Sequence, residues 1–358
     1  MHLKIARPTT PSLLAPLRQL PMLSVALALQ SCVLTAAVND NKGQLTGVLG
    51  RPTWYMEAPM GMVPIPAGSF MMGAVDDDIA GRIASNKKVT VSAYYMDATP
   101  VTNNQYRQFI EDMLDRVAEG DYGRLEEIME DMDEDYILTN LYPDASVWQR
   151  DFTHHMSDVW VSSYYEHTAF DHYPVVGVSW EAAQYFAKWR SAYLNEYRET
   201  KGLPDYPEFS LPSVAQWEYA ARGGKELTKY PWGGPYVRTH DGVLRANFKS
   251  DTGTFTEDGE GPYTSPVYTY PPNDYGLYDM AGNVAEWTLD AYNPAYMARI
   301  WDLNPVYLDD EEPMKIIKGG SWKDSSRFLQ TGANDYEHKD ATRSYIGFRC
   351  VIPHIGRQ

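Results

Sequence analysis

The chain has 358 residues, of which 44% are hydrophobic, and a formal net charge of −17 at pH 7. A chain of this length can bury a core for one large domain or two small ones. The negative charge argues against a protein that holds nucleic acid or anionic lipid headgroups through its overall field, because these ligands are themselves anionic. Only two cysteines, Cys32 and Cys350, are present.

Residues 1–31 have the pattern of a signal peptide. They contain three basic residues and no acidic one, and they include the largely apolar run MLSVALAL at 22–29. This run is too short to span a membrane as a helix, which needs about 20 apolar residues. Without residues 1–31, the net charge of the chain falls from −17 to −20.

The signal-like segment ends in LQSC at 29–32, which resembles a bacterial lipobox with Cys32 as the acylated residue. An ordinary secretory signal followed by a chance cysteine is the alternative. If Cys32 carries lipid, Cys350 is the single remaining thiol and no internal disulfide can form. Residues 32–56 are then a polar tether, and a folded domain is predicted over residues 57–358.

Short extended runs at 62–72 and 89–97 open the domain. Apolar and polar residues alternate in the second run well enough to predict a strand. Three helices are predicted from their N-terminal signals, because a Ser or Thr hydroxyl can accept a bond from an otherwise unpaired backbone N–H. They begin after Thr102 (with Gln105), after Ser179 (to about Tyr197), and after Ser213 (with Gln216, ending at Gly223).

Residues 111–135 contain twelve acidic residues and two arginines, a net charge of −10. This is half of the net charge of −20 that remains without residues 1–31. The alternation of Asp131, Asp133 and Asp135 is typical of a calcium loop, but Tyr136 stands where an EF-hand needs glycine. We therefore interpret the run as a solvated helical insertion. A basic surface of a partner could use it.

The stretch NDYGLYDMAGNVAEW at 273–287 is predicted to be a compact buried coil, because Gly276 and Gly282 permit tight turns between aromatic residues. It also contains three oxygen donors, namely Asp279, Asn283 and Glu286. Carboxylate, amide and carbonyl oxygens are ligands for a hard cation such as calcium. The alternative is that these groups only cap turns and satisfy buried backbone.

This stretch resembles the central motif of the formylglycine-generating-enzyme family, also called sulfatase-modifying-factor domains. The resemblance covers roughly residues 57 to 352 and implies an α+β, C-type-lectin-like single domain that is rich in loops. The other motifs follow in family order. They are GMVPIPAGSFMMG at 61–73, PVTN at 100–103, PVVGVSW at 174–180, LPSVAQWEYAARG at 211–223, GGSW at 319–322 and GFRC at 347–350.

The resemblance also locates the catalytic positions of the family. In its copper-dependent members, two cysteines just after the Gly-Gly-Ser motif bind copper(I), a metal that selects soft thiolates. In this chain the two positions are Asp324 and Leu329, and Cys350 lies in a motif whose cysteine is not catalytic. Iron-dependent relatives carry a histidine-rich helical domain that this chain has no room for. We therefore expect neither copper nor iron and no enzymatic activity.

Two calcium positions of the family fall on oxygen-bearing residues here. At the first site, a loop near Gly259–Ser265 differs in length from that of the family. At the second site, Asp279 replaces the usual asparagine of the family and keeps a side-chain oxygen. The resemblance implies Asn247, Phe248, Asp258 and Glu260 for the first site, and Asp279, Gly282, Val284 and Glu286 for the second.

A narrower resemblance is to the lipoproteins of the type IX secretion and gliding machinery. It rests on the lipobox, the acidic insertion, MMGAVDDD at 71–78, GGSWKD at 319–324 and RSYIGFR at 343–349. It implies a lipid-anchored protein on the periplasmic face of the outer membrane, which builds a ring with itself and a partner of the GldN (PorN) type. A periplasmic oxidase and a ligand-binding module that reuses the fold are the alternatives.

Overall fold

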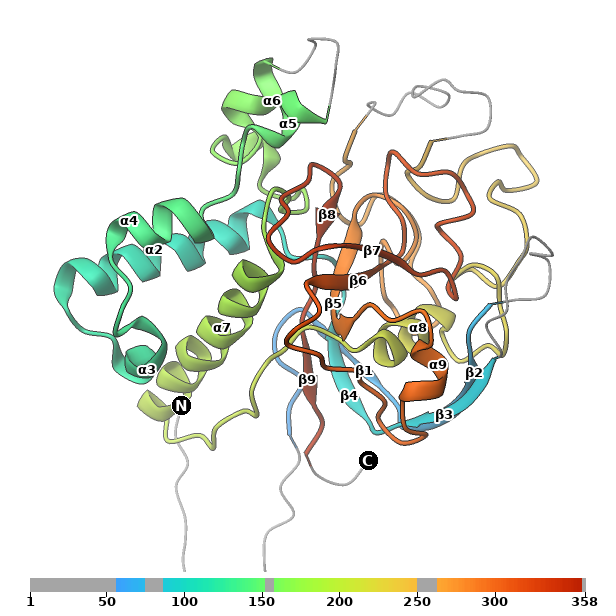
Figure 1. The fold of residues 1–358 in the computed structure, drawn as a ribbon, viewed down its shortest axis with the longest axis horizontal. Coiled ribbons are helices and arrows are strands. Elements are labelled where there is room, and N and C mark those ends of the chain that lie inside the picture. Colours follow the sequence, from blue (N-terminus) through green and yellow to red (C-terminus); the bar gives the residue numbers. More distant parts are fainter. Residues whose placement is uncertain (1–55, 75–85, 152–157, 250–262, 356–358) are drawn as a thin grey trace, which may run out of the picture. The chain divides into compact units, whose positions relative to one another are not determined.

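The computed structural model describes residues 56–74, 86–151, 158–249 and 263–355 (Figure 1). The predicted signal segment, Cys32, Asp258 and Glu260 lie outside the described residues. All the described helices and strands belong to the unit Tyr55–Gln358. No described helix has the length and apolarity that a membrane crossing requires.

The described strands form three small sheets, and most pairs are antiparallel. The exception is the parallel pair β5–β8, which brings the 285–291 strand beside the C-terminal motif. The sheets are β1 (Met62–Ile65), β4 (Tyr94–Asp97) and β9 (Val351–Pro353); β2 (Gly68–Met72) and β3 (Lys87–Val91); and β7 (Asp335–His338), β6 (Met314–Lys318), β5 (Ala285–Ala291) and β8 (Ile346–Gly347), each in spatial order.

The helices lie mainly between the first strands and the four-stranded sheet in the sequence. Figure 1 shows α2, α4 and α7 on one side of the domain and α8 and α9 beside the strands. The α-helices are α2 (Asn103–Glu119), α3 (Glu126–Met129), α4 (Glu134–Tyr136), α5 (Val147–Arg150), α6 (Asp158–Ser163), α7 (Trp180–Thr200), α8 (Val214–Arg222) and α9 (Tyr296–Arg299). Two 3-10 turns, Gly123–Leu125 and Thr168–Phe170, and one π-helical turn, Ile137–Leu141, lie among them.

All three predicted helix starts are confirmed. Thr102 and Ser213 each form a complete capping box with the glutamine three residues later, and the Ser179 hydroxyl accepts from the N–H of Ala182. Gly223 ends α8 in the left-handed conformation, at φ 57°, where glycine avoids the strain of a side chain. The predicted strands are also present. Each extended run forms two strands, which are separated by residues 66–67 in the first run and by residues 92–93 in the second.

The acidic run 111–135 is helical over much of its length and mostly exposed. Its two arginines pair with α7 and the residues after it: Arg116 with Glu196, and Arg124 with Glu199 and Asp205, while Arg116 also pairs with Asp112 on α2. Ion pairs at or near the surface contribute little each, so burial of the apolar helix faces is the main source of stability here. The rings of Tyr106 and Phe109 on α2 pack against Phe186 on α7.

The predicted buried coil at 273–287 is present, except that its last three residues begin β5. Trp287 on that strand is fully buried in the core shared by α2 and α7, and its indole N–H donates to the carbonyl of Val178 at 3.2 Å. On α8, the buried Trp217 anchors a second core with Val91 and Leu277. The two tryptophans therefore mark the two main apolar cores of the described residues.

We predict that Trp287→Ala lowers the free energy of unfolding by about 3–5 kcal/mol, because truncating a buried aromatic residue removes its contacts and leaves a cavity. Trp301→Ala is the matched control, since Trp301 is 81% exposed. A surface substitution of this kind should stay within about 0.5 kcal/mol. Chemical denaturation of both variants measures the difference, and equal effects would contradict the assigned burial.

Candidate functional site

A buried ion pair lies at the centre of the family-like motifs. The carboxylate of Glu286 on β5 accepts from Arg349 twice, at 2.7 and 2.8 Å, and from the indole N–H of Trp217 at 2.7 Å. Both charged side chains are fully buried. A bidentate pair with further hydrogen bonds is the arrangement that offsets the cost of removing two charges from water.

Arg349 also connects segments that are distant in the sequence. Its guanidinium donates to the carbonyls of Asp97, at the end of β4, and of Tyr278, in the 273–287 coil. Through Glu286 and Trp217 the same network reaches β5 and α8. The motifs GFRC and NVAEW therefore meet because an arginine from one neutralises a glutamate from the other.

The network bears on the predicted second calcium site. Three donors already occupy both oxygens of Glu286, and a cation bound to it would lie beside a positive guanidinium. Glu286 therefore does not fit as a calcium ligand in this arrangement, although the sequence had suggested it. Asp279 is buried in a left-handed conformation at φ 55°, in the coil that precedes β5. Gly282 and Val284 are buried in the same coil.

The structure brings the described part of the predicted first site against the second. The carbonyl of Asn247 accepts from the N–H of Asn283 at 2.8 Å, and a Cβ on Gly282 would lie 2.2 Å from that carbonyl. Only glycine allows this close approach. Phe248 is buried next to Leu329 in a small apolar cluster. Within the described ranges, no group of three or more His, Cys, Asp or Glu side chains is arranged to hold a metal ion.

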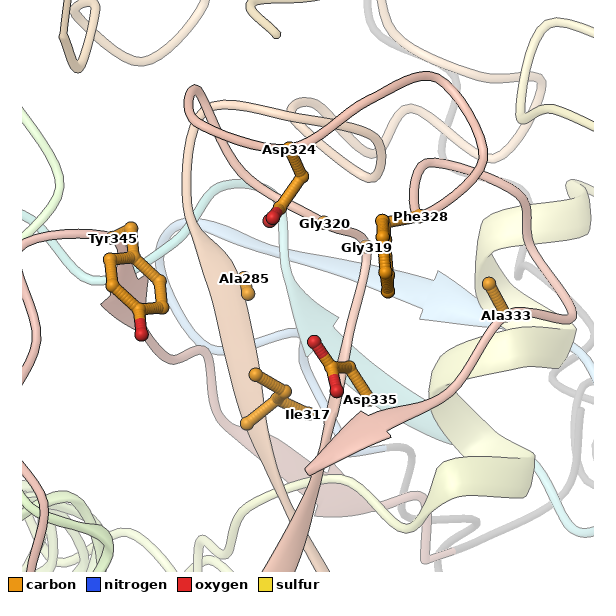
Figure 2. Close-up of a pocket in the computed structure, with 9 residues that line it drawn as sticks. All are labelled: Ala285, Ile317, Gly319, Gly320, Asp324, Phe328, Ala333, Asp335 and Tyr345. Atoms are coloured by element: carbon orange, nitrogen blue, oxygen red, sulfur yellow. The ribbon is translucent and has the colours of Figure 1, made fainter. Parts of the chain in front are cut away.

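A small hollow of about 280 Å³, open solvent included, lies next to the Gly319-Gly320 turn. Figure 2 shows the carboxylates of Asp324 and Asp335 pointing into it, with the rings of Phe328 and Tyr345 on different sides. Asp324 is held there because its carboxylate accepts from the N–H of Ser321 at 2.9 Å. The lining thus combines two carboxylates and two aromatic rings with the small or aliphatic residues Ala285, Ile317, Gly319, Gly320 and Ala333.

The two positions at which the family resemblance implies copper-binding cysteines have different surroundings in this chain. Asp324 lines the hollow, whereas Leu329 is fully buried in the apolar cluster with Tyr230 and Phe248. An aliphatic side chain offers no ligand, and one carboxylate is a hard oxygen donor that copper(I) does not select. The residues present therefore do not fit a copper(I) site.

Charges around the hollow interact with one another. Burial raises the pKa of Asp335, and the nearby carboxylate of Asp324 raises it further. The Lys323 ammonium lies 3.2 Å from the centre of the Tyr345 ring, and burial lowers its pKa. Sequence reasoning gave no site role to Asp335, which belongs to no quoted motif, or to Tyr345, which lies in RSYIGFR at 343–349. Only the fold brings them to Asp324.

Cys350 is fully buried and lies away from the lining of the hollow. Its N–H donates to the carboxylate of Asp97 at 2.9 Å, and that carboxylate also accepts two bonds from Arg190. Burial, and then the negative charge of Asp97, raise the pKa of the Cys350 thiol above its usual range. A thiol held in its protonated form is a poor nucleophile and a poor metal ligand.

This α+β, loop-rich arrangement defines a formylglycine-generating-enzyme-like domain. The chain belongs to the family of the sulfatase-modifying factor enzyme 1-like domain, whose family model matches residues 54–354. It is 29% identical to the inactive C-alpha-formylglycine-generating enzyme 2 of Bos taurus, over 81% of this chain and 87% of that protein. It is also 29% identical to the formylglycine-generating enzyme of Mus musculus, over 82% and 75%. The family thus includes active enzymes and inactive relatives.

Solved structures share the same fold. PvdO from Pseudomonas aeruginosa is 21% identical, with a TM-score of 0.58 over 85% of this chain and 99% of that one. CarF is 23% identical, with a TM-score of 0.52 over 83% and 99%. At these identities the likeness shows the fold alone, and the function has to be argued from the residues of this chain.

We predict that Glu286→Gln lowers the free energy of unfolding by about 3–5 kcal/mol, because it leaves the buried Arg349 charge uncompensated. If Glu286 serves the ion pair and no cation, the loss should be the same in EDTA and in excess calcium. Glu311→Gln, at an exposed site, is the control and should change little. Denaturation curves in both buffers measure this; a loss that appears only with calcium present would make Glu286 a metal ligand.

Proposed function

We propose that this protein is a non-catalytic structural subunit of an envelope assembly. The observation that carries the proposal is the pair Asp324 and Leu329, which stand where catalytic relatives place the copper-binding cysteines. Leu329 is fully buried among apolar side chains, and the one described thiol, Cys350, is buried elsewhere with a raised pKa. The inactive relatives in the family support this proposal.

The assembly that we propose is the type IX secretion and gliding machinery. The lipobox at 29–32, the acidic insertion and the ending RSYIGFR support a counterpart of the lipoprotein GldK (PorK), with GldJ as the close second. In this proposal, lipid on Cys32 holds the protein at the periplasmic face of the outer membrane. There it forms a ring with copies of itself and with a GldN (PorN)-like partner.

A ligand-binding module is the second candidate, and the hollow at Asp324 and Asp335 is the observation that favours it. Two carboxylates suit a cationic group through their charge; the Lys323 ammonium of the chain itself lies over the Tyr345 ring, which leaves the Phe328 ring for a cation–π contact. Calorimetric titration of the protein with lysine- and arginine-containing peptides distinguishes this candidate. Saturable binding that is lost in Asp335→Asn would favour a binding module over a purely structural subunit.

We predict that secretion persists in Cys350→Ala, because the thiol takes part in no chemistry. Loss of a small buried side chain should lower the free energy of unfolding by about 1–2 kcal/mol. The measurements are secretion, protein level, and co-purification of secretion components from detergent-solubilised envelope. Secretion that is abolished while protein level and co-purification stay normal would show that the thiol reacts. A failure to co-purify any such component in the native protein would contradict the assembly instead.

We predict that Cys32→Ala no longer fractionates with the outer membrane. Each buried CH₂ of an acyl chain contributes about 0.8 kcal/mol, and stable anchoring takes two or more chains. Ser31→Ala keeps the cysteine and a small residue before it, so it serves as the control. Fractionation after salt and carbonate washes measures the effect. Continued membrane association of the cysteine variant would mean that something other than lipid holds the protein.

A further inference from the structure

Exposed apolar side chains concentrate in one short segment. Among the described residues, 15 large hydrophobic side chains are exposed, and four of them lie within residues 301–308. Trp301 is 81% exposed, Leu303 63% and Leu308 64%, and Val306 accompanies them. Single exposed apolar residues are ordinary, but a cluster that includes a tryptophan is typical of a contact surface. We call Trp301, Leu303, Val306 and Leu308 the apolar ridge.

The first half of the ridge is fixed to β3. The N–H of Thr90 donates to the carbonyl of Asp302 at 2.7 Å, and the N–H of Asn304 donates to the carbonyl of Thr90 at 2.7 Å. The side chain of Asn304 exchanges two further bonds with Ser92, at 2.6 and 2.9 Å. Figure 1 shows the chain after α9 running past β3. Trp301 and Leu303 therefore project from an ordered, strand-like segment.

The second half is fixed to β5. The N–H of Tyr307 donates to the buried carboxylate of Asp290 at 2.8 Å, and the carbonyl of Tyr307 accepts from the N–H of Ala291 at 2.8 Å. Asp290 is further held by the N–H of Val214 and the hydroxyl of Tyr296. Because the segment is ordered before any partner arrives, little conformational entropy remains to be lost on binding.

The charge around the ridge is mixed at the Trp301 end, where Arg299 is exposed and Lys87 pairs with Asp302, and acidic at the Leu308 end. Residues 300–312 contain five acidic residues, Asp302 and the run DDEE at 309–312, and no lysine or arginine. Asp310 and Glu311 are exposed. One carboxylate oxygen of Asp302 lies 3.2 Å from the ammonium of Lys87. An apolar centre with a charged rim is the usual anatomy of a protein interface. Here the rim is negative at the Leu308 end, where the run DDEE follows.

We propose that the apolar ridge is a docking surface for a protein partner whose own contact face has an apolar centre and a basic rim. Charge complementarity selects this occupant, because the acidic run at 309–312 attracts a basic surface and repels an anionic membrane surface. The proposal is independent of the secretion role, since it rests on residues 300–312 and would hold for any partner of this chemistry.

Site-specific photocrosslinking of the full chain in the cell that makes it tests the surface. A benzoyl-phenylalanine replaces Trp301 in one strain and Leu308 in another, and Tyr236, at 75% exposure, is the control position. Both ridge positions should give one and the same adduct, which the control position does not give. Its mass should differ from twice that of the chain, and peptide sequencing should place lysines or arginines next to the crosslinked residue.

Reversing the charge of acidic residues then distinguishes an effect of the local rim on binding from an effect of the net charge of the chain. Asp310→Lys with Glu311→Lys should lower adduct yield at Trp301 by about tenfold, the loss expected when a rim charge pair turns repulsive. Glu126→Lys with Glu127→Lys on α3 makes the same change in net charge at another exposed place and should leave the yield unchanged. Equal melting temperatures of the two double variants exclude misfolding as the cause.

Three results would overturn the proposal. They are no ridge adduct above that of Tyr236, an adduct that joins two copies of this chain, and a yield that falls equally in both double variants. The first would show a ridge without a partner, the second a homotypic contact, and the third a response to net charge alone. A partner without basic residues at the crosslink would contradict the charge argument in the same way.

Discussion

The ion pair between Glu286 and Arg349 is the interaction on which the described fold depends most. It joins β5 to the C-terminal motif, and its further hydrogen bonds reach α8 through Trp217, the end of β4 through Asp97, and the 273–287 coil through Tyr278. A buried pair is weak evidence of net stability, because desolvation costs much of what the attraction gains. Its consequence is specificity, because any fold that buried one of the two charges without the other would leave that charge uncompensated.

The ion pair makes no use of the two positions where the family resemblance implies copper-binding cysteines. The hollow beside Gly319-Gly320 is lined by Ala285, the chain neighbour of Glu286, and by Asp324, at a position where the family resemblance implies a cysteine. Leu329 has joined an apolar cluster, where an aliphatic side chain contributes to packing. Neither the ion pair nor the apolar cores need a soft ligand at these two positions.

Local signals in the sequence predicted the local structure well. The capping boxes at Thr102 and Ser213 place helix starts correctly, because the bonds they make join residues only three apart. The glycines at 276 and 282 predicted a compact coil for the same reason. The role of Glu286 was less accessible, since oxygen donors within a few residues are equally consistent with a cation and with an arginine from elsewhere in the chain.

The sequence by itself determined the family, the helix starts, the burial of the central motif and the absence of a cysteine pair at 324 and 329, because each is written in residue types and short spacings. Only the tertiary structure decided that Arg349 neutralises Glu286, that Asp335 and Tyr345 face Asp324, and that an acidic segment displays Trp301 beside β3. These contacts join residues far apart along the chain, and no local pattern encodes which distant side chain will supply the opposite charge.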